Sequence, residues 1–455
     1  MATSASIADW LEVLSQLDRH GARRQSSPDA AGLVELMNLY RVPGLSIAVE
    51  QDGERPWAAG YGTVAADAPT PVGPQTVFQA CSISKHVAAF GALRLVDDRV
   101  LELDADINDY LTAWQLPASE GWRASVTLRQ VLAHTAGLSY NWFRGFGAGE
   151  PAPTMRQVLQ GQAPANTPPV RASLLPGSRF RYSGSHYAVL QQLVTDVTGE
   201  RFEDLMRVLV LDPVGMADSS FDQAFPAERP HLAAAGHHTD GTPVRGRWRT
   251  IPEMAGAGLW TTPSDLVRLE REIARAVTGG SALLSGDLAQ QMLTPQIPGG
   301  YGLGTEVDDS NGRLRFGHTG SNIGYNCFSF AWADTGAAVA VMANMDNARE
   351  ILGSILAAAE RLYGTPTDPP RPPTPDRATG RYLLRDDYLI EIGSVDGRLT
   401  ITAPGQPTVA LLPLAGDRYR VPGLDCEIRF PCAAEHVSAM EIRQEDVTET
   451  ATRQR

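Results

Sequence analysis

Lysine is almost absent from this sequence: of its 39 lysines and arginines, a single residue, Lys85, is lysine. Elsewhere the chain carries its positive charge on guanidinium groups, which stay protonated because their pKa lies above about 12. A buried lysine, by contrast, can lose its proton. Compositional drift would also leave one lysine, so the residues around Lys85 must decide whether a neutral amine is needed there.

Cysteine and excess basic charge are missing as well. The four cysteines are too few and too scattered for a disulfide scaffold or a four-cysteine zinc site, and we expect reduced thiols. They are Cys81, Cys327, Cys426 and Cys432. The formal net charge of -13 argues against a nucleic acid or an anionic membrane as partner, since both attract clustered basic residues. One cluster of three arginines, at 245–249, is interpreted either as a solvated loop or as a clamp for a substrate carboxylate.

Long apolar runs are also lacking. No uncharged apolar run approaches the roughly 20 residues of a membrane span, and the nearest, GAAVAVMANM at 336–345, has the length of a strand. The N-terminus carries Asp9, Glu12 and Asp18 where a signal peptide would need an uninterrupted apolar core. We therefore expect a soluble, cytoplasmic protein.

Motifs of several other enzyme classes do not occur. No serine lies in a G-x-S-x-G pattern, which disfavours an α/β-hydrolase triad, and the sole lysine follows a serine without the glycine of a P-loop. The chain shows neither a glycine-rich dinucleotide turn nor another cofactor signature, and its histidines lack a metal-ligand spacing such as H-E-x-x-H. We therefore expect no cofactor and no metal.

Hydrophobic periodicity places strands at both ends of the first 364 residues and helices between them. Residues 44–64 and 314–346 alternate as strands, the former around a turn at 52–53. Residues 9–40 have a helical pattern, and the other predicted helices are 82–98, 127–138, 185–199, 261–277 and 347–364. This pattern predicts an α+β fold, in which an antiparallel sheet built from both ends is flanked by helices and a helical subdomain is inserted.

A proline-rich segment divides the chain. Residues 365–376, TPTDPPRPPTPD, contain six prolines and predict a stiff linker between a first domain, 1–364, and a C-terminal domain, 377–455. Short alternating strands with a turn at 396–397 predict a small antiparallel β-barrel or sandwich there, of lipocalin-like form. Two roles remain open for this domain: one rim of a substrate pocket, or a separate stabilising module.

The residues around Lys85 give the lysine a chemical context. The chain reads Ser82-Ile83-Ser84-Lys85 at the start of a predicted helix, so Ser82 and Lys85 share a face and can touch. Burial and the positive end of the helix dipole would disfavour the ammonium, and Lys85 could then act as a base for the Ser82 hydroxyl. The S-x-x-K pattern alone is a weak signal, because four-residue patterns arise by chance in a long chain.

Two further segments strengthen the signal. One is PGSRFRYSGSHY, with Tyr182 after a Pro-Gly turn, and the other is RFGHTGSNIGY, in which His318-Thr319-Gly320 opens a predicted strand. The order and spacing of the three motifs resemble the serine β-lactamase and penicillin-binding-protein superfamily over about 42–364, closest to its class C-like branch. That branch also holds esterases, D-amino-acid peptidases and amidases, and peptide-cyclising thioesterases.

The resemblance implies a role for each matching residue. Ser82 would be the nucleophile, Lys85 its proton acceptor, and Tyr182 and His318 the other members of the catalytic centre. The backbone amides of Ser82 and Ser321 would form the oxyanion hole. The residues expected to contact the substrate are Thr319, Gly320, Asn322 and Tyr140.

One motif departs from the family pattern. Residues 182–184 read Tyr-Ser-Gly, without the asparagine that commonly binds a substrate amide. Its absence puts β-lactamase activity in doubt and favours ester cleavage, although Ser185, His186 or Asn322 could replace the missing contact. His134, in LAHTAGL, imitates the third motif, and we expect it to be structural because it lies at a predicted helix end.

These residues predict a serine hydrolase that forms an acyl-enzyme on Ser82 and cleaves ester or amide bonds of a small-molecule or peptide substrate, as an esterase or a D-amino-acid peptidase. An acyltransferase or a peptide-cyclising thioesterase, with an amine as acceptor in place of water, is the alternative within the enzyme class. A sensor module that is acylated without turnover is the alternative of another class. The sequence chooses neither the acyl acceptor nor the oligomeric state.

Overall fold

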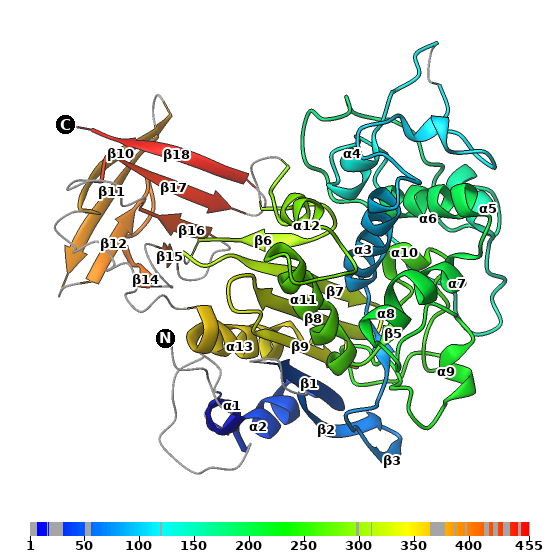
Figure 1. Cartoon of the computed structure of the whole chain (residues 1–455). Helices are drawn as coiled ribbons and strands as arrows, with labels where there is room; N and C mark the ends of the chain where they lie inside the picture. Colours follow the sequence, from blue (N-terminus) through cyan, green and yellow to red (C-terminus); the bar gives the residue numbers. More distant parts are fainter. Residues whose placement is uncertain are drawn as a thin grey trace. The chain divides into compact units, whose positions relative to one another are not determined.

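The chain divides into two compact units, Met1–Gly364 and Thr365–Arg455. The computed structural model describes residues 7–15, 17, 31–50, 56–118, 121–296, 300–310, 312–364, 378–385, 388–395, 398–413, 418–421, 426–430, 437–444 and 447–454. Figure 1 labels the elements of both units. The predicted turns at 52–53 and 396–397, the proline-rich segment 365–376 and Cys432 lie outside the described residues.

A seven-stranded antiparallel sheet is the framework of the first unit, in the order β3-β2-β1-β9-β8-β7-β6. Its strands are β1 Gly44–Glu50, β2 Trp57–Ala65, β3 Ala68–Pro71, β6 Glu306–Asp308, β7 Arg315–Asn322, β8 Tyr325–Trp332 and β9 Ala338–Ala343. Strand β1 pairs with β9, with Ala48 opposite Ala340, so the two ends of the unit meet inside the sheet. The predicted α+β class with an antiparallel sheet is confirmed.

Helices cover both faces of the sheet and fill the middle of the unit (Figure 1). The helices that pack directly on the sheet or close its apolar layers are α1 Ile7–Ser15, α2 Ala31–Tyr40, α11 Pro263–Val277 and α13 Arg349–Ala359, the last followed by η3 Glu360–Gly364. The other helices are α3 Ile83–Asp97, η1 Ile107–Asp109, α4 Leu128–Leu132, α5 Met155–Gln160, α6 Gly184–Thr198, α7 Phe202–Met206, η2 Arg207–Leu211, α8 Asp212–Val214, α9 Phe225–Glu228, α10 Met254–Ala257 and α12 Gly286–Met292. A short pair, β4 Phe78–Gln79 and β5 Trp260–Thr261, lies among them. Within the described ranges, no helix has both the length and the apolar character that a membrane crossing requires.

The alternation of side chains along the strands explains the two layers of helices. Ile47 of β1 and Val341 of β9 share an apolar cluster with residues of α1, α2 and α13. Their neighbours Ala48 and Ala340 belong to a second cluster, on the face where α11 packs against β1, β8 and β9. Because alanine is small, it lets a helix approach the sheet closely. The sheet thereby holds β7 at a fixed position beside the helical middle.

The observed helix ends agree with most of the predicted ones. Helix α11 begins after Thr262, whose Oγ1 accepts a hydrogen bond from the amide of Asp265 at 3.2 Å, and Pro263 is its first residue. The prediction for 127–138 is wrong at its end: α4 stops at Leu132, because His134 adopts a left-handed φ of 57° that an α-helix does not allow. Residues 9–40 contain α1 and α2, and residues 18–30 between them lie outside the described part.

The second unit is a nine-stranded antiparallel sheet in the order β13-β12-β11-β10-β18-β17-β16-β15-β14. Its strands are β10 Gly380–Arg385, β11 Tyr388–Val395, β12 Arg398–Thr402, β13 Val409–Ala410, β14 Leu412–Pro413, β15 Arg418–Arg420, β16 Cys426–Arg429, β17 Ala439–Gln444 and β18 Val447–Arg453. Only Leu411 separates β13 from β14, the two edges of the sheet, so the sheet curls until its edges come close. The antiparallel β-domain is confirmed in this form, and the lipocalin-like detail stays a prediction.

Candidate active site

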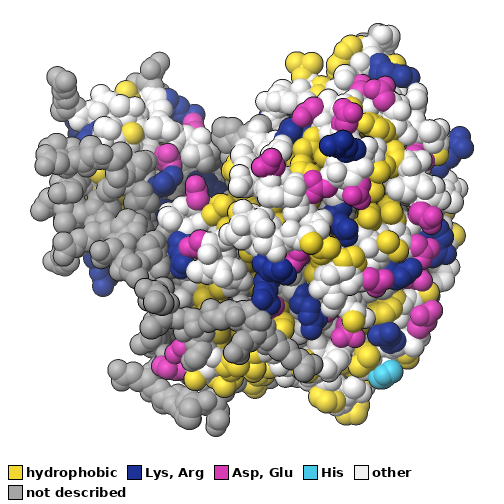
Figure 2. All heavy atoms as spheres, in the orientation of Figure 1, with side chains coloured by type: hydrophobic (Ala, Val, Ile, Leu, Met, Phe, Trp, Pro, Cys, Tyr) yellow, Lys and Arg dark blue, Asp and Glu magenta, His cyan; other side chains and the backbone are white. Residues whose placement is uncertain are grey.

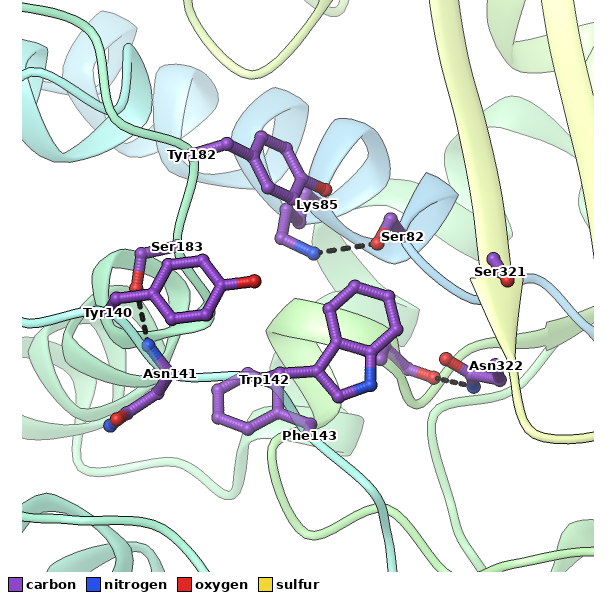
Figure 3. A pocket seen from close by; sticks show the side chains of 12 residues that line it. Ser82, Lys85, Tyr140, Asn141, Trp142, Phe143, Tyr182, Ser183, Ser321 and Asn322 are labelled. Atoms are coloured by element: carbon purple, nitrogen blue, oxygen red, sulfur yellow. Dashed lines mark hydrogen bonds between the residues drawn. The ribbon is translucent and has the colours of Figure 1, made fainter. Parts of the chain in front are cut away.

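Ser82 and Lys85 lie at the N-terminus of α3. Just before the helix, Cys81 has a φ of 53°, unusual for a residue with a side chain, and turns the chain from β4 into α3. Ser82 occupies the N-cap position, yet its hydroxyl makes no capping hydrogen bond. Lys85 Nζ instead donates to Ser82 Oγ at 2.9 Å, as Figure 3 shows. It also donates to the carbonyl oxygen of Gly256 at 2.7 Å. The two side chains that the S-x-x-K pattern predicts to touch therefore do so.

The surroundings of Lys85 favour its neutral form. The residue is 3% exposed, and burial lowers the pKa of its amine from the usual 10.5 to about 7, with the charge of Cys81 acting in the opposite direction. The amine lies 5.0 Å from the ring centroid of Tyr182 and 5.8 Å from that of Tyr187. A neutral amine has a lone pair, which could accept the Ser82 proton across the 2.9 Å contact.

Tyr182 belongs to the loop that leads into α6. Ser183, the N-cap of α6, fixes this loop, because its hydroxyl donates to the carbonyl oxygen of Ser139 at 2.8 Å and accepts from the amide of Asn141 at 2.9 Å. Burial raises the pKa of the Tyr182 phenol well above its usual range, and an interaction with Ser82 opposes this effect. The phenol therefore carries its proton at neutral pH, and Tyr182 lines one pocket together with Ser82 and Lys85.

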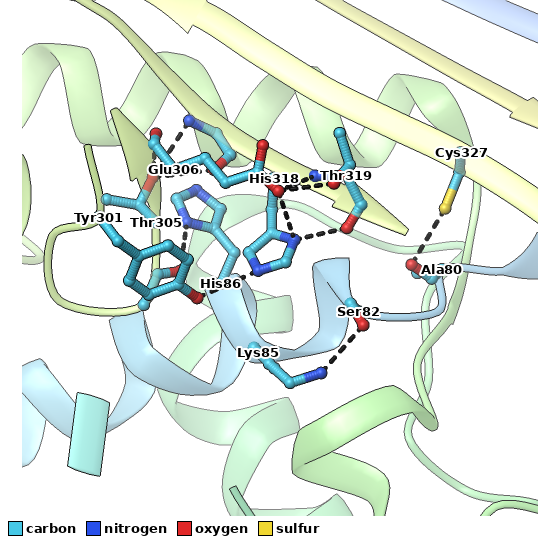
Figure 4. Close-up of polar contacts among 12 residues, drawn as sticks. Ala80, Ser82, Lys85, His86, Tyr301, Thr305, Glu306, His318, Thr319 and Cys327 are labelled. Atoms are coloured by element: carbon cyan, nitrogen blue, oxygen red, sulfur yellow. Dashed lines mark hydrogen bonds and ion pairs between the residues drawn. The ribbon is translucent and has the colours of Figure 1, made fainter. Parts of the chain in front are cut away.

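His318, on β7, lies behind this pocket and is not among the residues that line it. The residue is 1% exposed, its Nε2 lies 3.1 Å from Tyr301 Oη, and its Nδ1 contacts the carbonyl oxygen of Thr319 (Figure 4). Burial lowers the pKa of His318 to about 4, while Glu306 opposes this shift. The imidazole is therefore neutral near pH 7, and its ring centroid lies 6.1 Å from that of Tyr182.

Gly320 allows β7 to lie against the segment that carries the serine. A Cβ at this position would lie 2.6 Å from Cys327 Sγ and 2.7 Å from the carbonyl oxygen of Ala80, so only glycine fits without a shift. The next residue on the strand, Ser321, lines the same pocket as Ser82. These are the two residues whose backbone amides we predict to form the oxyanion hole.

The other predicted substrate contacts differ in their positions. Tyr140 lines the pocket and is 61% exposed. Asn322 also lines it, but its Nδ2 donates to Gln79 Oε1 at 3.0 Å and to the carbonyl oxygen of Ala257 at 3.2 Å. Thr319 is not part of the lining, and its Oγ1 donates to Glu306 Oε1 at 2.6 Å.

Much of the pocket wall was missed by the sequence analysis. After Tyr140, the residues Asn141, Trp142 and Phe143 all line the pocket, which encloses about 340 Å³ including its open mouth. The available signal was the run of aromatic residues directly after the predicted helix 127–138, because binding residues often lie in the segments that follow regular elements. His134, expected to be structural, packs against Tyr182 with ring centroids 4.3 Å apart.

The arginine cluster at 245–249 does not belong to this pocket. Arg247 Nη2 lies 3.8 Å from Asp67 Oδ1, and Arg249 Nη1 donates to the carbonyl oxygen of Gly145 at 3.3 Å. On the face shown in Figure 2, acidic and basic side chains are mixed. These contacts favour the solvated-loop interpretation over a substrate clamp. Among the described residues, no group of His, Cys, Asp and Glu side chains is arranged to hold a metal ion.

A buried pair anchors the helix that carries Ser82 and Lys85. His86 Nε2 lies 3.1 Å from Glu270 Oε2 of α11, and both side chains are at most 1% exposed. The other ring nitrogen lies 3.2 Å from the carbonyl oxygen of Gly304. Burial alone would lower the pKa of His86, but the charge and hydrogen bond of Glu270, together with the Gly304 carbonyl, raise it above its usual value. The pair joins α3 to α11.

The comparison with protein families identifies the first unit. A family model described as Beta-lactamase matches residues 31–360. The chain belongs to the β-lactamase family. This result confirms the resemblance that the three motifs indicated, and the matched residues include every predicted site residue.

Several curated proteins are similar to the chain. Penicillin-binding protein 4 of Amycolatopsis lactamdurans is 25% identical over 358 residues, which cover 73% of this chain and 91% of that protein. A D-aminopeptidase of Gluconobacter oxydans is 27% identical over 365 residues, covering 76% of this chain and 64% of the relative. Esterase EstB of Burkholderia gladioli is 28% identical over 235 residues, covering 49% and 58%. The family and these relatives together indicate a hydrolase of the serine β-lactamase type.

A solved structure shares the fold. The octameric penicillin-binding protein homologue from Pyrococcus abyssi superposes with a TM-score of 0.59 and 23% sequence identity, covering 92% of this chain and 98% of that one. At this identity the likeness shows the fold alone. The α+β architecture described above is thus one that penicillin-binding protein homologues also adopt.

Proposed function

We propose that the chain is a serine hydrolase that cleaves an ester or amide bond through an acyl-enzyme on Ser82. The observation that carries this proposal is the contact between Lys85 Nζ and Ser82 Oγ, at 2.9 Å, with burial lowering the pKa of Lys85 to about 7. A D-aminopeptidase and an esterase among the relatives support the same class of reaction. The substrate would be a small molecule or peptide with an acyl group.

The reaction would run in two halves. Ser82 Oγ attacks the carbonyl carbon while Lys85 Nζ takes the hydroxyl proton, and the negative oxygen of the tetrahedral intermediate accepts hydrogen bonds from the amides of Ser82 and Ser321. The bond to the leaving group then breaks, and that group takes a proton from Lys85 through the Tyr182 phenol. A water molecule then attacks the carbonyl carbon of the acyl-enzyme ester and gives a proton to the same pair. The bond between that carbon and Ser82 Oγ breaks, Oγ takes the proton back, and the acid is released.

His318 would act on this centre through its neighbours. It is not part of the pocket lining, so we propose that it positions Tyr182 and keeps the local charge low by staying neutral. Replacing His318 with asparagine would then lower kcat more than it raises KM, because orientation is lost while the binding wall is intact. A rise in KM with an unchanged kcat would instead indicate that His318 has a substrate-binding role.

A fluorophosphonate probe and a small activated ester together test the proposal. Turnover of the ester with labelling of Ser82 supports a hydrolase, whereas stoichiometric labelling without turnover would support the acylated sensor. Lys85→Arg should lose at least about 100-fold in kcat/KM, since a guanidinium cannot take the serine proton. An amine acceptor added to the assay, followed by mass spectrometry of the products, distinguishes water from an amine as acyl acceptor.

A further inference from the structure

Phe143 occupies the space where the family motif would place the side chain of its third residue. A Cβ added to Gly184, which follows Tyr182 and Ser183, would lie only 2.5 Å from Phe143 Cε2 and 2.6 Å from its Cζ. On its other side the ring is equally close to Gly256, where a Cβ would lie 2.7 Å from Cε2. Phe143 is 7% exposed. The ring is therefore held between two glycines, and neither position admits a larger residue while Phe143 is present.

The loss of the motif asparagine is not compensated by another amide group in the pocket. The Nδ2 of Asn141 donates to the carbonyl oxygen of Pro168 at 3.1 Å, and Figure 3 shows this side chain pointing away from Ser82 and Lys85. The Nδ2 of Asn322 is used by Gln79 and Ala257. Ser185 and His186, which could have replaced the contact, are buried and do not line the pocket. The Nδ2 groups of both side-chain amides of the lining thus donate to the protein, and Asn141 Oδ1 is buried without a hydrogen-bond partner among the described residues.

Charge is also scarce in the wall. Of the described residues that line the pocket, Lys85 alone has a basic or acidic side chain other than a phenol, and its amine is the proposed base. The Glu306 carboxylate is not part of the lining, and its Oε1 accepts from the amide of Thr319 at 3.0 Å and from its hydroxyl. A substrate ammonium or carboxylate would therefore lose its water without gaining a partner of opposite charge in the wall.

The exposed part of the wall is aromatic. Tyr140 is 61% exposed and Trp142 is 48% exposed, and Figure 3 shows both rings facing the space in front of Ser82 and Lys85. Aromatic rings offer a large apolar contact area at low cost in conformational entropy. They also leave two polar groups, the tyrosine hydroxyl and the indole N–H, at the mouth of the pocket.

We propose, on the basis of the hydrolase function above, that this pocket is specific for esters with an uncharged, apolar or aromatic acyl group, and that Phe143 is the residue that sets this specificity. The packed ring replaces a hydrogen-bonding side chain by an apolar one. An ammonium or an amide in the acyl group, close to the scissile carbonyl, would meet this ring and no carboxylate among the described residues of the pocket lining. Such substrates should be disfavoured by about 10- to 100-fold in kcat/KM.

Two matched pairs of activated esters test the specificity with the full-length chain. The first compares a 3-phenylpropanoyl ester with the D-phenylalanyl ester, which adds only an α-amine. The second compares a 4-methylpentanoyl ester with the N-acetylglycyl ester of nearly the same shape, which adds an amide. We expect the apolar member of each pair to have at least a tenfold higher kcat/KM. Equal or higher values for the D-phenylalanyl ester would overturn the proposal, and a Glu306→Gln variant would then show whether that carboxylate binds the amine.

Variants at Phe143 test its part in the specificity. Phe143→Ala combined with Gly184→Asn removes the ring and supplies an amide side chain, whose Cβ would still lie 3.0 Å from the backbone oxygen of Asn141. We expect the ratio of N-acetylglycyl to 4-methylpentanoyl cleavage to rise at least tenfold. Phe143→Leu keeps an apolar wall and should keep the original ratio. Phe146→Leu, at a buried phenylalanine of the same loop outside the lining, is the matched control. An unchanged ratio in the folded double variant would refute the role of Phe143.

The failure of this inference and of the proposed function can be told apart. If the wild-type chain cleaves p-nitrophenyl acetate and the Ser82→Ala variant does not, the hydrolase function holds, whichever of the larger esters has the higher kcat/KM. A higher kcat/KM for the charged or amide-bearing esters would then contradict the specificity proposal alone. If no ester is cleaved and no phosphonate labels Ser82, the hydrolase function itself is wrong, and the specificity proposal falls with it.

Discussion

The rate of ester hydrolysis should depend on pH through the ionisation of Lys85. At the usual pKa of 10.5, about one lysine amine in 3,000 would be neutral at pH 7, whereas at the lowered pKa of about 7 close to half of the molecules carry the neutral amine. Because only the neutral form accepts the Ser82 proton, kcat/KM should fall about tenfold for each pH unit below about 6 and level off above about 8.

The assay measures kcat/KM for one chemically stable ester from pH 5 to pH 9. Glu253 is the necessary control, since burial also raises its pKa to about 7 and it immediately precedes α10, whose Gly256 carbonyl accepts from Lys85. The acid limb should persist in Glu253→Gln. A flat profile, or a limb that disappears in Glu253→Gln, would refute the assignment of Lys85 as the base.

Three further predictions concern the scaffold. Gly320→Ala should destabilise the chain by about 1–3 kcal/mol and reduce kcat, because its Cβ would lie 2.6 Å from Cys327 Sγ; thermal unfolding and ester turnover measure both, and a neutral change contradicts the close packing. Glu270→Gln should cost about 3 kcal/mol in urea unfolding. Since the pKa of His86 is raised, the contribution of the His86–Glu270 pair to the free energy of unfolding is fully present below pH about 6.5 and is lost as pH rises through the folded-state pKa. If the free energy of unfolding of the wild type minus that of the variant grew with pH, this prediction would be contradicted. Each unit has its own apolar core, so a chain ending at Gly364 should show the circular dichroism of a folded α+β protein and cleave a small activated ester, and loss of either would show that the second unit is required.

The sheet and the serine-lysine contact were accessible to sequence reasoning, because both rest on local patterns. Alternation in 44–64 and 314–346 predicts strands, and a three-residue spacing on a helix places Ser82 beside Lys85. The end of α4 was not accessible, since His134 closes the helix in a left-handed conformation that is uncommon for a residue with a side chain, and the amide of Thr135 donates to the carbonyl oxygen of Gln130 at 2.9 Å.

The residues that line the pocket could be predicted from the sequence only in part. The glycine at position 184 was recognised as a missing asparagine, but the residue that fills its place, Phe143, lies 41 positions earlier in a loop. The contact depends on how that loop folds back on the start of α6, which no periodicity describes. His318 is a similar case: its motif was recognised, but neither its burial nor its contact with Tyr301 could be read from the sequence.

Peptide mass spectrometry after reaction with a fluorophosphonate tests the central claim most directly. The account predicts one adduct per chain, located on Ser82, and no adduct on a folded Ser82→Ala variant. Labelling should also slow in Lys85→Arg, because the serine then lacks its base. An adduct on another residue, with the buried neighbour Cys81 as the first to inspect, or undiminished labelling of Ser82→Ala, would contradict the assignment of Ser82 as the nucleophile.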